Sequence, residues 1–68
     1  MKNEKLVAAR KRSGKNQVQV AKEVGIATIA YQSYELRKRT PIVTTAIRIA
    51  KTLGTTVEEL WDTKERRS

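Results

Sequence analysis

The sequence lacks both cysteine and histidine. No disulfide can form without cysteine, and without either residue there is no thiolate or imidazole to bind a metal or to act as a nucleophile or base. The acidic residues are scattered along the chain and form no recognisable acid–base or metal-binding set. We therefore expect no enzyme, no metal, no cofactor and no small-molecule ligand, and a fold that depends on apolar packing.

Long apolar runs are also absent. No stretch approaches the length that crosses a membrane, and the N-terminal MKNEKLVAARKR lacks the apolar segment of a signal peptide. The basic residues are not confined to one face of a single amphipathic helix, so a membrane-surface peptide is disfavoured as well. We expect a cytoplasmic protein that has no membrane partner.

Acidic residues are few relative to basic ones. The chain has 15 Lys and Arg against 7 Asp and Glu, which gives a formal net charge of +8 and a pI near 10.3. A surplus this large in 68 residues points to a polyanionic partner such as nucleic acid. A positive charge also keeps many small domains soluble, so the charge alone favours a nucleic-acid partner only weakly. It becomes strong evidence when the sequence also contains a DNA-binding motif.

Strand-like alternation of apolar and polar residues is missing, and the apolar residues recur at helical spacing instead. This pattern predicts an all-α fold, a compact bundle of five short helices. Four lie at about residues 4–12, 17–24, 28–35 and 43–53, and a short fifth helix opens after Thr56. At 68 residues the chain has room for one domain. We expect that domain to span residues 1–62, and the charged residues 63–68, which lack an apolar anchor, to form a frayed tail.

Polar residues stand where several of these helices should begin. Asn3 and Asn16 are expected N-caps, and Gln19, three residues after Asn16, nearly completes a capping box. Thr56 opens the last helix in the same way. Within the helix at 43–53, the predicted apolar face comprises Val43, Ala46, Ile47, Ala50 and Leu53, with Ile49 beside it.

The stretch from Asn16 to Glu35, NQVQVAKEVGIATIAYQSYE, predicts two helices joined by a tight turn. Gly25 stands at that turn, where a residue without a Cβ adopts a positive φ at little cost. Helix, glycine-containing turn and second helix is the helix-turn-helix arrangement. In that motif the second helix lies in the major groove of DNA.

Further residues at fixed spacing resemble one family. They are Gln17-x-x-x-Ala21-x-x-x-Gly25, then Tyr34-Glu35, Pro41 and Ile49-Ala50-Lys51-x-Leu53-Gly54. Over about residues 5–61 the chain resembles the lambdoid phage repressor and Cro family, whose bacterial members are xenobiotic-response-element-type regulators. The resemblance implies a lambda repressor-like domain that binds double-stranded DNA as a homodimer on a two-fold operator, most often as a repressor. An antitoxin or adaptor of the same fold, with a protein as its main partner, is the alternative.

The second helix of the motif, at about residues 28–35, is the predicted recognition helix. The chain departs from that family at both of its ends. Ala27 stands where members usually have Ser or Thr, so we expect Thr28 to cap the helix one residue later. Gly or Asn often ends the helix near Leu36 and Arg37 in the family, and neither is present here. We therefore expect this helix to run a little beyond Glu35.

Four residues form the expected outward face of the recognition helix if Tyr31 and Tyr34 turn inward. These candidate base contacts are Thr28, Ile29, Gln32 and Ser33. The alternative is that these residues form an ordinary solvent-facing surface without a binding role. Ile29 could also lie in the core if the helix is rotated. The face has no Arg, Lys or Asn, so we expect modest specificity with a share of shape readout.

Candidate contacts to the DNA backbone flank that face. The resemblance assigns such a contact to Gln17, and Asn16 stands beside it at a helix N-terminus, where phosphates bind well. Arg37, Lys38 and Arg39 follow the recognition helix directly. Plain capping by Asn16 and a merely solvated charge run are the alternatives.

Two further sets are structural. In family members an Arg and a Glu at the places of Arg10 and Glu35 often form a partly buried ion pair, and the resemblance implies one here. For the homodimer, Ile42, Val57 and Trp61 are the candidate apolar patch, since Trp is the residue type most enriched at interface hot spots. The alternative for Trp61 is that it folds back over its own core.

Overall fold

Residues 2–61 are described by the computed structural model, and within them the chain is helical, with no strand. The helices are α1 (Glu4–Arg12), α2 (Gln17–Val24), α3 (Thr28–Glu35), α4 (Val43–Leu53) and α5 (Val57–Leu60). The predicted all-α fold is therefore confirmed, with boundaries close to those expected. None of these helices is long and apolar enough to cross a membrane. The expected charged tail at 63–68 lies outside the described residues.

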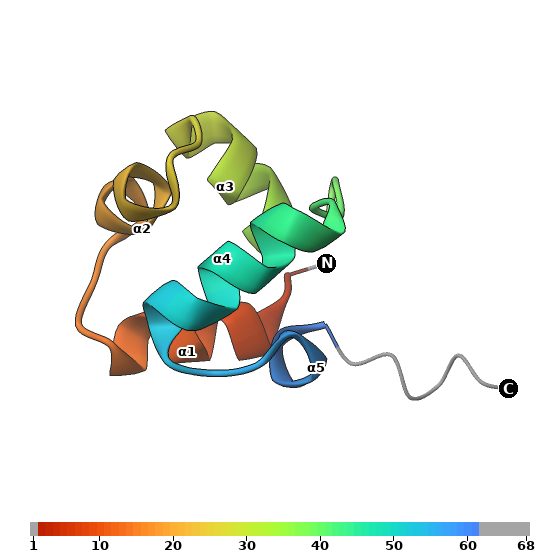
Figure 1. Cartoon of the computed structure of the whole chain (residues 1–68). Helices are drawn as coiled ribbons and strands as arrows, with labels where there is room; N and C mark the ends of the chain where they lie inside the picture. The colour runs from red at the N-terminus through yellow and green to blue at the C-terminus, as the bar shows by residue number, and fades with distance from the viewer. Residues whose placement is uncertain (1, 62–68) are drawn as a thin grey trace, which may run out of the picture.

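The core draws one fully buried side chain from every helix. Leu6, Val20, Tyr31, Ile49 and Leu60 are each between 0 and 1% exposed. In Figure 1, α4 crosses the middle of the molecule, with α2 and α3 on one side and α1 and α5 on the other. The helices are thus held by a single apolar centre on which α3 is mounted.

Local signals fix most helix ends as the sequence predicts. The Asn16 side chain accepts the Gln19 N–H at 2.8 Å, and the Gln19 side chain accepts the Asn16 N–H at 2.8 Å, so the capping box is complete. Thr56 Oγ1 accepts the Glu59 N–H at 3.2 Å. Gly25 has φ +88°, a left-handed conformation that suits glycine. The tight turn between α2 and α3 therefore rests on Gly25.

Asn3 does more than the capping that its sequence position predicts. Its side chain accepts the Leu6 N–H at 3.1 Å and also donates to the Leu60 carbonyl at 3.0 Å. Its backbone N–H donates to the Glu35 carbonyl at 2.7 Å. Because Asn3 is fully buried, these bonds tie the start of α1 to the ends of α3 and α5 in a dry environment.

Both expectations about the ends of α3 are wrong. Thr28 is the first helical residue, and the N-cap is Ala27, whose side chain makes no capping bond. At the other end the helix stops at Glu35, because Arg37 adopts φ +60°. The N–H groups of Arg37 and Lys38 donate to the carbonyls of Tyr34 and Ser33, which is the Schellman pattern that ends a helix.

Replacing Arg37 by glycine is expected to stabilise the fold by about 1 kcal/mol, since a side chain in the left-handed region is strained by roughly that amount. Urea-induced unfolding would measure the gain. Lys38→Gly is the matched control. Lys38 does not have a positive φ, so glycine relieves no strain there and should destabilise the domain through its greater freedom in the unfolded chain. Equal or lower stability of Arg37→Gly would mean that the Arg37 side chain compensates the strain.

The buried face of α4 also differs from the predicted one. Ile49 is fully buried, with Ala46, Ala50 and Leu53, whereas Val43 is 75% and Ile47 is 42% exposed. Both sets have helical spacing, so periodicity could not separate them. Packing of α4 against α2 and α5 decides the matter, and it leaves an apolar strip of α4 uncovered.

Candidate nucleic-acid interface

The outward face of α3 is defined by the two tyrosines that point the other way. Tyr31 is fully buried, and Tyr34 is partly buried and packs against the core, as predicted. Ile29 is 74% exposed, so it does not belong to the core. Thr28 and Ser33 are partly buried on the same helix, and the Ser33 hydroxyl donates to the Ile29 carbonyl at 3.0 Å. The helix therefore presents an uncovered apolar side chain among small hydroxyl residues.

Gln32 is engaged differently from its neighbours on α3. Its amide nitrogen donates to Gln17 Oε1 at 3.0 Å, and Gln17 Nε2 donates in turn to Glu35 Oε1 at 2.8 Å. Gln17 is the first residue of α2. The structure thus joins the expected backbone-contacting end of α2 directly to the outward part of α3, a link that no spacing in the sequence had indicated.

An ion pair joins α1 to the end of α3. Arg10 Nε lies 2.6 Å from Glu35 Oε2, and the two side chains are only 14% and 4% exposed. Arg10 also donates to the Lys15 carbonyl at 3.2 Å. Burial by itself would raise the pKa of the Glu35 carboxyl, but the hydrogen bonds from Arg10 and Gln17 outweigh it and hold that pKa below its ordinary value. Glu35 is therefore a buried carboxylate in its ionised form.

Tyr31 borders this pair from the core side. Burial, with the nearby Glu35 charge, raises the pKa of its hydroxyl well above the ordinary tyrosine value. The side chain therefore stays neutral, and because it is fully buried it packs in the core and cannot stack on bases. This agrees with the inward orientation on which the outward face of α3 depends.

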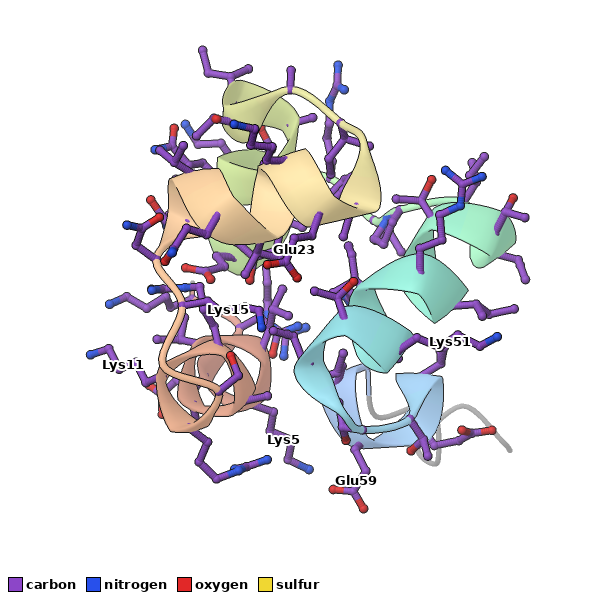
Figure 2. The ribbon with its side chains drawn as sticks, turned by 60° about the vertical axis from the view of Figure 1, so that its left-hand side comes forward. Lys5, Lys11, Lys15, Glu23, Lys51 and Glu59 are labelled. Atoms are coloured by element: carbon purple, nitrogen blue, oxygen red, sulfur yellow. The ribbon has the colours of Figure 1, made fainter. Side chains whose placement is uncertain are left out.

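Cations flank the outward face at its C-terminal end. Arg37, Lys38 and Arg39 are all exposed and follow the last turn of α3, while Asn16 is exposed at the start of α2. Lys15, in the connection after α1, instead lies 3.6 Å from Glu23 of α2 in a partly exposed pair, and Lys11 extends outward from α1 (Figure 2). The cations best placed beside this face are therefore Arg37, Lys38 and Arg39.

Two of the three expected dimer residues, Val57 and Trp61, line one apolar hollow. Ile42 is 70% exposed, whereas Val57 and Trp61 are partly buried and pack against the chain's own core. Val57 and Trp61 line a hollow of about 170 Å³ together with Val43 of α4. Sequence reasoning missed Val43 here, although its i, i+4 spacing to Ile47 marks a second apolar face of α4.

This geometry, with a short second helix held across a glycine turn, is that of a helix-turn-helix domain. A family model described as "Helix-turn-helix" matches residues 6–60. The chain belongs to this helix-turn-helix family, of the Cro and repressor type, which confirms the resemblance inferred from its motifs. The matched domain is therefore of a DNA-binding, non-enzymatic type.

One relative carries a functional name. The chain is 35% identical over 65 residues to the cryptic phage CTXphi transcriptional repressor RstR of Vibrio cholerae serotype O1. The match covers 91% of this chain and 58% of RstR, so the chain spans less than two thirds of that repressor's length. No solved structure was found to match the chain.

Proposed function

We propose that this protein is a transcriptional regulator, and specifically a repressor, that inserts α3 into the major groove of double-stranded DNA as a homodimer. The observation that carries the proposal is the uncovered Ile29 on α3, 74% exposed, in a helix-turn-helix domain of formal net charge +8. An exposed isoleucine gains most from a partner with apolar groups, and thymine methyls offer them in the major groove. Similarity to the repressor RstR supports repression rather than activation of transcription. Such a protein works in the cytoplasm, at the nucleoid.

Base readout falls to three residues of α3. Thr28 and Ile29 offer methyl groups to thymine, and Ser33 offers a hydroxyl to a base edge. Asn16 and Gln17 at the start of α2, with the exposed cations Arg37, Lys38 and Arg39, contact phosphates. The outward face of α3 has no Arg, Lys or Asn. The sequence preference of the complex is therefore modest, with a contribution from DNA shape.

A homodimer reads a longer DNA site than one copy of α3 can. A helix of 8 residues reads few base pairs, and two-fold proteins solve this by reading half-sites about 34 Å apart. The second copy covers the hollow bordered by Val57 and Trp61, together with the exposed Ile42. An apolar hollow beside exposed apolar side chains is the self-complementary surface that a two-fold interface needs.

Selection of bound sites from random duplexes, followed by a salt titration, tests this function. We expect a two-fold symmetric site, and a log affinity that falls with log salt by about 0.9 for each phosphate neutralised. Lys38→Ala should weaken binding on all duplexes alike and reduce that slope by about 1, whereas Ser33→Ala should change the preferred bases.

Binding that is absent at low salt, or insensitive to salt, would contradict the DNA-binding function. The same fold would then serve as an antitoxin or adaptor whose partner is a protein, for which the apolar hollow beside Val43 and Trp61 is the favoured surface. A change of base preference in Lys38→Ala would show that the two kinds of contact are wrongly assigned.

A further inference from the structure

A series of hydrogen bonds links the two helices of the motif to one carboxylate. Gln32 Nε2 donates to Gln17 Oε1 at 3.0 Å, and Gln17 Nε2 donates to Glu35 Oε1 at 2.8 Å. The other oxygen of Glu35 accepts from Arg10 Nε at 2.6 Å. Since Gln32 and Glu35 both lie on α3 and Gln17 begins α2, the series clamps the N-terminus of α2 against α3.

The charge on Glu35 dictates the direction of both amides. A carboxylate only accepts hydrogen bonds, so Gln17 must turn its amide nitrogen toward Glu35. The Gln17 oxygen then faces Gln32, which must present an N–H rather than its own oxygen. A reversal of either amide would bring two acceptors together. The orientation of Gln17 is therefore held from both sides, by Glu35 and by Gln32.

This arrangement leaves Gln17 with one amide N–H that the two contacts do not use. Gln17 stands in the first turn of α2, where backbone N–H groups have no acceptor within the helix, and Asn16 takes only that of Gln19. A phosphate oxygen at this position would accept both from the backbone and from the Gln17 side chain. The side chain is pre-oriented for that contact before DNA arrives.

We propose that Gln32 is a positioning residue that acts on DNA through Gln17, and so sets the affinity for every duplex rather than the choice of base. The inference rests on the proposed DNA-binding function and replaces the base-reading role expected from the place of Gln32 on α3.

Three variants test this role: Gln32→Met, Gln17→Met and the two combined. Methionine keeps the length of the side chain and removes the amide. On the selected operator and on unrelated duplexes alike, Gln32→Met should raise Kd about threefold to tenfold, the size of one hydrogen bond. Because Gln32 is neutral, the salt slope should stay the same. The double variant should be no weaker than Gln17→Met alone, since the contact that Gln32 orients is then already lost.

A second readout locates the phosphate. Neutral methylphosphonates placed one at a time in the operator should reveal a phosphate whose loss weakens the wild type, and that effect should shrink in both single variants. Thermal unfolding of each variant controls for folding, and Gln32→Leu is the substitute if Gln32→Met is unstable.

Three results would overturn the inference. A loss of affinity confined to the operator, with a changed preference at one base pair, would make Gln32 a base reader. An unchanged Kd of Gln32→Met on every duplex, or additive losses of affinity in the double variant, would show that Gln32 does not act through Gln17. Failure of the wild type itself to bind any duplex would instead remove the proposed function, and it is seen before any variant is made.

Discussion

Replacing Glu35 by alanine is expected to destabilise the domain by about 3–5 kcal/mol, the usual consequence of removing one partner of a buried ion pair. Glu35 is 3% exposed, and its removal leaves the Arg10 guanidinium, itself 14% exposed as a side chain, without a counter-charge. Gln17 loses its acceptor as well. For a domain of this size the melting temperature should fall by about 12 °C or more.

The Lys15–Glu23 pair provides a matched control for this result. Its side chains are 27% and 50% exposed and lie 3.6 Å apart, so Glu23→Ala should cost less than about 1 kcal/mol. Both variants remove one carboxylate from the same small domain. A Glu35→Ala melting temperature as close to the wild type as that of Glu23→Ala would show that the burial of the pair contributes nothing to stability.

The pH dependence of the same pair has a defined sign. The pKa of Glu35 lies below its ordinary value of 4.5, so the folded state prefers the carboxylate. Stability from the pair is therefore complete above the unfolded-state pKa and is lost as pH falls through the folded-state pKa. The difference in stability between the wild type and Glu35→Gln should shrink from pH 7 toward pH 3. A difference that stays constant over this range would contradict the lowered pKa.

Loss of the proposed homodimer is expected to have the second large effect. Truncation of an interface hot spot costs about 2 kcal/mol or more, so Trp61→Ala should weaken operator binding about thirtyfold. Sedimentation across a concentration series should show a dimer for the wild type and a monomer for this variant. The physical reason is that Trp61 and Val57 line an apolar hollow, which the second copy in the proposed dimer would cover.

Because Trp61 also packs on its own core, a second variant must separate interface from fold. Ile42→Ser changes a side chain that is 70% exposed, so the monomer should stay equally stable while the dimer weakens. Val18→Ser, at 58% exposed on α2, is the control that should leave the association unchanged. A wild-type chain that sediments as a strict monomer, with Trp61→Ala binding DNA as the wild type does, would exclude the dimer.

Features that depend on neighbours in the chain were determined by the sequence alone. Asn16 with Gln19, and Gly25 after Val24, fix the boundaries of α2 within a few residues, because caps and glycine turns act through local backbone hydrogen bonds. The ordered motif residues likewise predicted the helix-turn-helix family and the inward orientation of Tyr31. These signals need no knowledge of what lies across the molecule.

Where local sequence signals allow two arrangements equally, only the tertiary structure decides between them. Two apolar faces of α4 have the same periodicity, and contact with α2 and α5 selects the one that contains Ile49. Arg37 has no local preference for φ +60°, yet the chain must turn there to bring α4 back over the core. Gln32 resembles any outward polar residue of a recognition helix until α2 brings Gln17 within 3.0 Å of it. Long-range packing free energy outweighs local propensity at each of these positions, and it has no signature in residue spacing.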